Sequence, residues 1–283
     1  MKILVTGASG QLGFDVVKEL KKRGIQYIAP THEEFDLTNQ VQVLEFFEYN
    51  QVDAVIHCAA YTAVDKAQEE STLCHSVNAS ATRFIAKQCG RLDIPLLYIS
   101  TDYVFPGVGS TPYETTDRKG PVQEYGLSKL AGEEMVKSLC KKYYIVRVSW
   151  VFGKHGKNFV RTVLHLADTK EIINVVDDQI GSPTYTKDLA PLLCDMIESG
   201  KYGIYHATNE GFCSFYEFAC EIVKQAGKTV EIRPTTTALY NAPAKRPLNS
   251  RLSKASLDEA GFSRLPDWQD ALSRYLKELG IKE

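Results

Sequence analysis

The sequence predicts an α/β fold in which a doubly wound parallel sheet is followed by a smaller, irregular α+β region. Short apolar strands alternate with amphipathic helices as far as Trp150, and a glycine-rich turn joins the first strand to the first helix. Beyond Trp150 the strands become short and isolated. Parallel strands need long crossover connections, and helical crossovers cover both faces of the sheet. We therefore expect right-handed crossovers around a buried sheet.

The elements of the first half are set by hydrophobic periodicity. In the first helix Leu12, Val16, Val17 and Leu20 share one face, and the strands are short apolar runs bounded by polar residues. The pattern predicts strands at 2–6, 26–30, 53–59, 95–100 and 143–150, and helices at 11–24, 41–50, 74–89 and 124–143.

The composition excludes several classes of function. Lys and Arg total 33 and Asp and Glu total 35, so a net charge of −2 provides no basic surface for nucleic acid. The apolar runs are too short to cross a membrane, and the chain opens on a strand rather than a signal sequence. The seven cysteines are odd in number and contain no CxxC pair. They indicate free thiols in a cytoplasmic protein, without disulfides or a metal site.

Gly7, Gly10 and Gly13 lie on the turn between the first strand and the first helix, where doubly wound folds bind a dinucleotide pyrophosphate. Glycine permits a tight turn and close approach of the backbone to phosphate. The helix that follows offers free N–H groups at its N-terminus. Residues 1–150 are therefore expected to form a dinucleotide-binding core of the Rossmann type.

The ribose end of this site carries no clear determinant. The second strand ends at Pro30 without the acid that typically contacts the ribose of NAD, and no arginine follows for a 2′-phosphate. His32 can lie near a phosphate, and Asp36 and Leu37 can frame the adenine. The preference between NADPH and NADH is left open.

A second group of residues predicts hydride transfer to or from a carbonyl. Ser100 and Thr101 end the fourth strand, and Tyr125 and Lys129 lie four residues apart on one face of a helix. Ligands bind at the carboxyl ends of strands in such sheets. We expect the Lys129 ammonium to lower the pKa of the Tyr125 phenol, so that Tyr125 can protonate a developing alkoxide. Thr101 can donate to the carbonyl oxygen.

The second half is expected to be mainly a substrate-binding region, residues 151–283, interleaved with the core. The segment at about 174–200 is expected to return to that core. Basic residues such as Lys157 and Arg161 suit a diphosphate. Periodicity predicts helices near 158–168, 186–198, 214–226 and 266–279, and isolated strands at 173–176, 203–208 and 229–234.

Motifs along most of the chain carry a family resemblance. They run from residue 3 to about 252 and include TGASGQLG, FDLTN, HCAAYTAVDKAQ, STDYVFPG, YGLSKLAGE, RVSWVFG, DDQIGSPT and RPLNSRL. In these segments the chain resembles extended short-chain dehydrogenase/reductases that act on nucleotide sugars, and among them the dTDP-4-dehydrorhamnose reductases. The resemblance implies NADPH, with NADH as the alternative. It implies reduction of the C4 keto group of dTDP-4-dehydro-L-rhamnose to dTDP-L-rhamnose for polysaccharide biosynthesis, and it allows a homodimer.

The resemblance also implies roles for individual residues. The cofactor-binding residues would be Gly7, Gly10, Gln11, Leu12, Gly13, Asp36, Leu37, Ala60, Tyr61, Thr62, Tyr125 and Lys129, and the catalytic residues Thr101, Tyr125 and Lys129. The substrate-binding residues would be Thr101, Asp102, Trp150, Val64, Asp65, Arg246, Asn249 and Arg251. Purely structural roles are the alternative for four of these residues. Trp150 can be a core residue, Asp65 can cap a helix, and the arginines can be solvated loop charges.

Some members of the family hold Mg²⁺ at a dimer contact through acids on the first helix and a later helix. Asp15 matches the first position, but the later position reads Lys187–Asp188, so this chain departs from the pattern. We therefore assign no metal ligand.

Two other functions remain open. One is a nucleotide-sugar epimerase or dehydratase on the same fold. The family's dehydratases carry Thr-Asp-Glu at the end of the fourth strand, whereas this chain has Thr101, Asp102 and Tyr103, which favours simple reduction. The other is a non-catalytic NADP-binding regulatory subunit resembling that of methionine adenosyltransferase. The intact Thr101, Tyr125 and Lys129 argue against it, because a binding module needs no tuned phenol.

Overall fold

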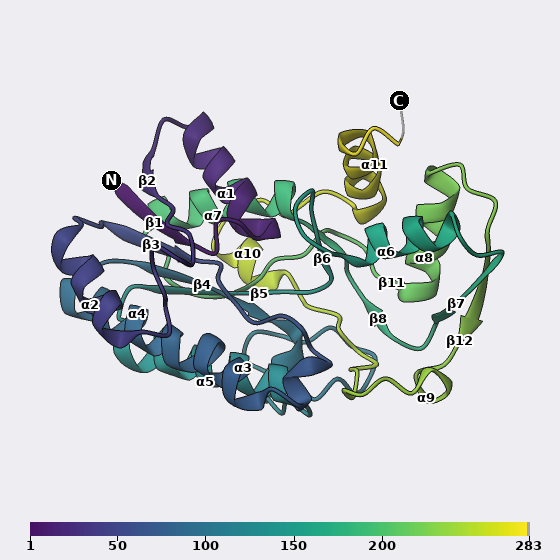
Figure 1. The fold of residues 1–283 in the computed structure, drawn as a ribbon, viewed down its shortest axis with the longest axis horizontal. Helices are drawn as coiled ribbons and strands as arrows, with labels where there is room; N and C mark the ends of the chain where they lie inside the picture. Colours follow the sequence, from purple (N-terminus) through teal and green to yellow (C-terminus); the bar gives the residue numbers. More distant parts are fainter. Residues whose placement is uncertain (282–283) are drawn as a thin grey trace.

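A six-stranded, wholly parallel sheet forms the half of the molecule that carries the N-terminus (Figure 1). This computed structural model describes residues 1–281. The strand order is β10-β5-β4-β3-β1-β2, so the chain winds outward in both directions from the neighbours β1 and β3. The predicted doubly wound sheet is confirmed. Its strands are β1 (Lys2–Thr6), β2 (Gln26–Ile28), β3 (Ala54–His57), β4 (Leu96–Thr101), β5 (Tyr143–Val148) and β10 (Gly203–His206).

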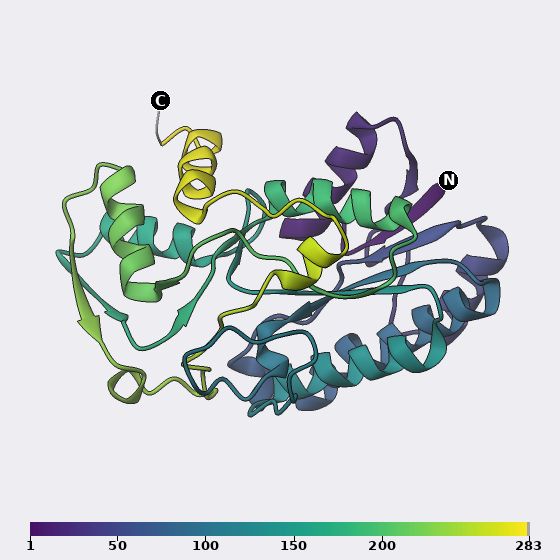
Figure 2. The ribbon, with the colours of Figure 1, turned by 180° about the vertical axis from the view of Figure 1, so that it is seen from behind.

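Helices cover both faces of this sheet (Figures 1 and 2). One face carries α1 (Gln11–Lys22) and α7 (Thr186–Ser199), and the other carries α2 (Gln40–Tyr49), α4 (Ala81–Leu92) and α5 (Glu124–Leu139). The apolar stripe predicted for the first helix explains its position, because Val16 and Leu20 are fully buried against β1 and α7. α1 ends at Lys22, and Gly24, which follows the C-cap residue Arg23, adopts a φ of +68° that suits glycine.

A smaller region with its own apolar core lies beside the sheet. Its helices are α6 (Phe159–Ala167), α8 (Phe215–Gln225), α9 (Thr237–Tyr240), α10 (Ala255–Glu259) and α11 (Trp268–Glu278), although α10 packs back onto the main sheet. Its strands form three pairs, namely β6 (Val151–Phe152) with β9 (Thr184–Tyr185), β7 (Ile172–Val176) with β12 (Glu231–Thr235), and β8 (Ile180–Gly181) with β11 (Cys213–Ser214). Phe152, Tyr185, Phe218, Trp268 and Tyr275 fill its core. None of the helices described between residues 1 and 281 is long and apolar enough to cross a membrane.

The chain passes between the two regions more than once. The sequence analysis treats the run at 203–208 as an isolated strand, and this is wrong, because β10 is the edge strand of the main sheet and pairs with β5. Nothing local in this short run indicates a partner about 60 residues away. The part of the chain that returns to the core comprises α7 and β10, whereas residues 172–176 pair with β12. The division of the chain at residue 150 stays a prediction.

The helix predicted from Cys74 to Cys89 is interrupted by one π-helical stretch. It consists of α3 (Ser71–His75), the π-helical residues Ser76–Ser80, and α4. Such π turns are rare inside α-helices and are frequent at functional sites. Here the turn carries Asn78 into the interior.

Candidate active site

A cavity of about 780 Å³ opens at the carboxyl ends of the parallel strands. Its walls come from the turns that follow β1, β2, β3 and β5 and from the end of β4. It therefore lies at the sheet edge that binds ligands in doubly wound folds. The predicted site residues that line it are Gly7, Gly10, Gln11, Leu12, Gly13, Asp36, Leu37, Ala60, Thr62, Val64, Thr101, Asp102, Tyr125, Lys129 and Trp150.

The three glycines of the phosphate loop are required for different reasons. Gly7 has a φ of +67°, and a Cβ atom there would lie 2.6 Å from the backbone nitrogen of Ala59. A Cβ atom at Gly13 would lie 2.2 Å from the carbonyl oxygen of Gly7. These two glycines are therefore needed by the fold itself. At Gly10 a Cβ atom would meet only the Gly7 carbonyl oxygen, at 3.2 Å, and the backbone φ is an ordinary −80°.

Gly10 faces a site that fits a dinucleotide pyrophosphate. It is the N-cap of α1, and no side chain caps the N–H groups of that first turn. Free N–H groups and the positive end of the helix dipole bind phosphate. Gly10 lines the cavity, so a side chain at this position would project where the phosphate approaches. The fit rests on this open, uncapped helix end.

The phosphate loop is also joined to the second region. The Asn158 amide nitrogen donates to Oε1 of Gln11 at 3.0 Å and to the Tyr275 hydroxyl at 3.1 Å. The Tyr275 hydroxyl in turn donates to the carbonyl oxygen of Gly153 at 2.9 Å. Since Tyr275 belongs to α11, the last helix helps to position the first residue of α1.

The predicted catalytic side chains lie together on β4 and α5. Thr101 is the last residue of β4, Tyr125 lies in the first turn of α5, and both side chains line the cavity. Lys129, with 2% of its surface exposed, donates from Nζ to the carbonyl oxygen of Ile99 at 2.6 Å. The same ammonium lies 4.1 Å from the centre of the Tyr98 ring, which suits a cation–π contact.

The electrostatics of the phenol differ from the prediction. Burial and the Asp102 carboxylate raise the pKa of Tyr125, and the hydrogen bond with Thr101 only opposes this rise. Burial also lowers the pKa of Lys129 to about 7, so its amine is only partly charged at neutral pH. The expectation that Lys129 lowers the pKa of Tyr125 is therefore wrong for this structure. The phenol stays protonated at neutral pH.

Asp102 is the other buried ionisable group of the site. It is 3% exposed, its Oδ1 accepts from the Thr101 hydroxyl at 3.0 Å, and its Oδ2 has no hydrogen-bond partner. Burial raises the pKa of Asp102 to about 6, although the nearby hydroxyls of Ser250 and Thr101 oppose the rise. A buried polar atom without a partner is unfavourable by about 1–3 kcal/mol, so it commonly marks a place where a ligand donates.

Trp150 has a strained backbone at the mouth of the site. Its φ is +48°, which is rare for a bulky side chain. The indole is half-buried, lines the cavity, and stacks on Phe215 with ring centres 3.8 Å apart. The Trp150 ring therefore lines the cavity and also packs against the apolar core of the second region. Its role as a substrate contact stays a prediction.

Five predicted residues do not line this cavity, namely Tyr61, Asp65, Arg246, Asn249 and Arg251. Asp65 accepts from Nη2 of Arg246 at 2.7 Å, and the buried Nη1 of Arg246 has no partner. Asn249 donates to the carbonyl oxygens of Val108 and Thr111 and accepts from Arg251, so its amide is fully engaged within the protein. The role of Asn249 as a substrate contact stays a prediction.

Asn78 is a functional candidate that the sequence analysis missed. It is 1% exposed, and its amide exchanges two hydrogen bonds with the backbone of Tyr61, at 2.9 and 3.0 Å. Its Nδ2 also donates to the Ser128 hydroxyl at 2.9 Å. These contacts hold the cavity-lining loop with Ala60 and Thr62 against α5. The available signal was one amide on an otherwise apolar helix face.

A buried ion pair supports the end of the catalytic strand. Arg147 and Glu133 are both buried and form two charge-assisted hydrogen bonds of 2.8 and 2.7 Å. The Ser100 hydroxyl donates to the same carboxylate at 2.5 Å. Ser100 is therefore occupied in holding β4 to α5, and Thr101 is the hydroxyl left for chemistry.

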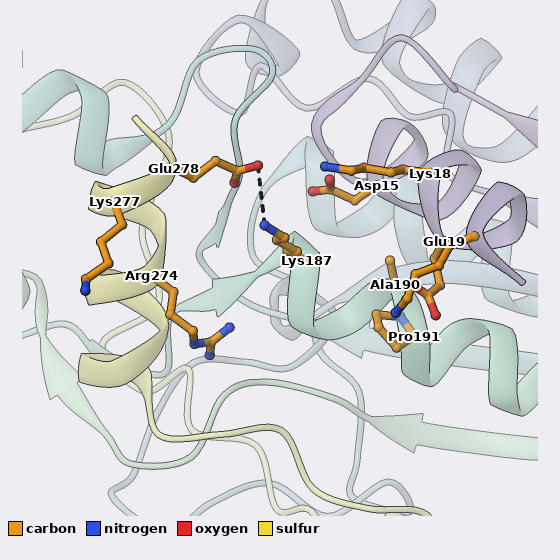
Figure 3. A pocket seen from close by; sticks show the side chains of 10 residues that line it. Asp15, Lys18, Glu19, Lys187, Ala190, Pro191, Arg274, Lys277 and Glu278 are labelled. Carbon is orange, nitrogen blue, oxygen red and sulfur yellow. Dashed lines mark hydrogen bonds and ion pairs between the residues drawn. The ribbon is translucent and has the colours of Figure 1, made fainter. Parts of the chain in front are cut away.

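A second cavity, of about 730 Å³, lies where α1, α7 and α11 meet (Figure 3). Asp15 accepts from the Thr186 hydroxyl at 2.5 Å, and the Lys187 ammonium lies 3.7 Å from Oε1 of Glu278. Figure 3 shows that ammonium directed toward Glu278, on the side where Asp15 lies. Magnesium requires oxygen ligands, and a lysine supplies none. The described residues 1–281 contain no cluster of three or more His, Cys, Asp or Glu side chains that could hold a metal.

Comparison with known proteins identifies the family. A family model described as "RmlD substrate binding domain" matches residues 1–281. The chain belongs to this family. One curated relative, the spore coat polysaccharide biosynthesis protein SpsK of Bacillus subtilis, is 42% identical and covers 98% of this chain and 97% of its own length. Another, the dTDP-4-dehydrorhamnose reductase of Aggregatibacter actinomycetemcomitans, is 40% identical and covers 96% and 97%.

Solved structures agree with this assignment. A dTDP-4-dehydrorhamnose reductase from Clostridium acetobutylicum is 40% identical, with a TM-score of 0.97 over 99% of this chain and 100% of its own. The enzyme of the same name from Bacillus anthracis, solved in complex with NADP, is also 40% identical, with a TM-score of 0.95 over 98% and 99%. A UDP-glucose 4-epimerase from Thermus thermophilus, at 21% identity and a TM-score of 0.86, shares only the fold of this RmlD family member.

Proposed function

We propose that this chain is an NADPH-dependent reductase that converts dTDP-4-dehydro-L-rhamnose to dTDP-L-rhamnose. The observation that carries the proposal is that Thr101, Tyr125 and Lys129 line one cavity with the open glycine loop at Gly10. The names of the relatives and the NADP complex of the Bacillus anthracis enzyme support it. The relation to a spore coat polysaccharide protein supports a place in polysaccharide biosynthesis.

In the proposed reaction the bound NADPH supplies a hydride to C4 of the sugar. Tyr125 donates its phenolic proton to the C4 oxygen as negative charge develops there. Its raised pKa suits this direction, because the phenol is protonated at neutral pH and an alkoxide is a stronger base. The Thr101 hydroxyl turns from Asp102 to donate to the same oxygen. Lys129 orients the nicotinamide ribose.

The substrate contacts form the second part of the proposal. Asp102 would accept from a sugar hydroxyl through its unpartnered Oδ2, and Trp150 would cover the sugar ring with its half-buried indole. Arg246 is held by Asp65 at 2.7 Å while its Nη1 lacks a partner, which suits a diphosphate oxygen. Val64 lines the cavity between these groups and the cofactor loop.

The proposal also covers the cellular compartment and the oligomeric state of the enzyme. The seven cysteines are all unpaired, which supports a reducing cytoplasm. A homodimer stays a prediction.

A dehydratase would need an acid where this chain has Tyr103. The Tyr103 ring packs edge-on against Tyr125, with ring centres 5.6 Å apart, and it carries no carboxylate for proton abstraction. This position favours reduction without elimination. A purely regulatory subunit would leave the Thr101 and Tyr125 hydroxyls, which both line the cavity, without a chemical use.

The test is to measure turnover with a panel of 4-keto nucleotide sugars. The loss of NADPH absorbance reports the rate with each sugar. We expect the dTDP-linked 4-keto-6-deoxy-L-hexose to be reduced and dTDP to compete with it. Reduction of a free keto sugar with no inhibition by dTDP or UDP would overturn the substrate assignment. Binding of NADPH with no turnover of any keto sugar would favour the regulatory alternative.

A further inference from the structure

The turn after β2 forms one end of the active-site cavity. β2 is the edge strand beside β1, and His32, Asp36, Leu37 and Thr38 from the turn that follows it line the cavity. The catalytic residues lie three strands away, at the end of β4, a separation of about 14 Å at about 4.8 Å per strand. With the pyrophosphate on the loop after β1, the β2 turn must receive the adenosine half of a dinucleotide.

Two of the acids of this turn, Glu34 and Asp36, accept hydrogen bonds within the turn itself. The Glu34 carboxylate accepts from the backbone nitrogen of Thr31 at 2.8 Å. The Asp36 carboxylate accepts from the backbone nitrogen and the hydroxyl of Thr38, at 2.9 and 2.7 Å. A site specific for NAD needs an acid that accepts from the ribose 2′-hydroxyl. Neither Glu33 nor Glu34 lines the cavity, so the turn offers no such acid from these positions.

His32 is the basic group at this end of the cavity. Its side chain is exposed at the rim, where an imidazole N–H can donate to an incoming phosphate. Besides His32, the basic side chains among the described lining residues are Lys129, from α5, and Lys157, from the loop before α6. The hydrogen bond from Lys129 to the carbonyl oxygen of Ile99 holds its amine at the catalytic end of the cavity. Lys157 neighbours Gly156, which packs over Gln11 of the phosphate loop, so it serves the pyrophosphate end.

We propose that His32 binds the 2′-phosphate of NADPH and so determines the preference for NADPH over NADH. The inference rests on the dinucleotide site of the proposed function and adds the residue that reads its adenosine ribose. Glu34 and Oδ1 of Asp36 are held in local hydrogen bonds, and the His32 imidazole at the rim can donate to a phosphate. Discrimination between NADPH and NADH therefore comes from the attraction of the 2′-phosphate to His32. It does not come from repulsion of that phosphate by an acid of the turn.

Binding measurements with adenosine 2′,5′-bisphosphate and AMP test this without any turnover, because the two ligands differ only in the 2′-phosphate. We expect wild-type protein to prefer the bisphosphate by about tenfold or more, as for a hydrogen bond to a charged group. His32→Ala should bring the two affinities close together, and His32→Arg should restore the preference. In kinetics, His32→Ala should raise KM for NADPH while leaving kcat and the KM for NADH unchanged.

Two control variants sharpen the test. Lys157→Ala should weaken NADPH and NADH alike, since both carry the pyrophosphate, and His165→Ala, on the exposed side of α6, should change neither. An unchanged preference in His32→Ala would overturn the inference. So would equal binding of the two ligands by wild-type protein, with the dinucleotide site intact. If wild-type protein bound neither ligand nor NADPH, the proposed function would fail as well.

Discussion

Replacing Lys129 by methionine should stabilise the protein while removing its activity. Burial lowers the pKa of Lys129 from an ordinary value of about 10.4 to about 7. That difference corresponds to about 5 kcal/mol of unfavourable burial for the charged form. Methionine would leave the carbonyl oxygen of Ile99 without its donor, which costs about 1–3 kcal/mol. The net gain expected at pH 6 is about 2–4 kcal/mol in the free energy of unfolding.

The gain should depend on pH in a defined direction. Because the folded pKa of Lys129 lies below its unfolded value, the unfolded chain binds more protons between about pH 7 and pH 10. The stability contributed by wild-type Lys129 therefore rises with pH across that window. The advantage of Lys129→Met should be largest below pH 7 and should shrink as the pH approaches 10.

Thermal unfolding of both proteins at pH 6 and near pH 10 measures this effect. A gain of about 2–4 kcal/mol should raise Tm by about 4–8 °C at pH 6, at about 2 °C per kcal/mol for a protein of this size. Lys87→Met, on the exposed side of α4, is the matched control and should shift stability by less than about 0.5 kcal/mol at either pH. A Lys129→Met variant no more stable than wild type at pH 6 would refute the reasoning. An equal gain at both pH values would show that packing, not charge, is the cause.

Four further single variants and one double variant test other parts of the structure. Tyr125→Phe should lower kcat by about two to four orders of magnitude with little change in NADPH affinity, as for loss of a general acid; near-wild-type turnover would contradict this. Gly10→Val should abolish NADPH binding in calorimetry with the fold intact, whereas Gly13→Ala should lower Tm, because its Cβ would lie 2.2 Å from a carbonyl oxygen. Arg147→Met should destabilise the protein by about 3–5 kcal/mol in denaturant unfolding, since the Glu133 carboxylate is left buried and unpaired. Adding Glu133→Leu should recover much of that loss.

Local patterns in the sequence predicted the parts of the site that depend on local geometry. The glycine loop occupies seven consecutive residues between a strand and a helix, from Gly7 to Gly13, and spacing alone places it at the sheet edge. Tyr125 and Lys129 share a helix face because they are four residues apart. Their electrostatics could not be predicted in the same way. The pKa values depend on burial and on Asp102, which reaches the site from another element.

The errors arose where distant segments meet. The strand at Gly203–His206 joins the main sheet by pairing with β5, and the sequence of a four-residue run does not predict that pairing. Asn78 acts through a π turn whose extra residue changes the helix face, and periodicity analysis assumes a regular helix. Asn249 belongs to a motif shared with the family, and its amide is hydrogen bonded to the loops around it, so its assignment as a substrate contact stays a prediction. Motif membership alone does not separate a ligand contact from a structural one.

The contacts of Asn158 with Gln11 and Tyr275, and of Thr186 with Asp15, limit how this protein can be recombined. Two of these contacts join a residue of the first helix to one from the second half, at 3.0 Å for Gln11 and 2.5 Å for Asp15, and the third links Asn158 to the last helix. The partners must match in length and polarity. A chimera that took residues 1–150 from one relative and the remainder from another would have to inherit both ends of these pairs together. The cofactor loop and the C-terminal helix must therefore come from the same parent protein, although they lie near opposite ends of the sequence.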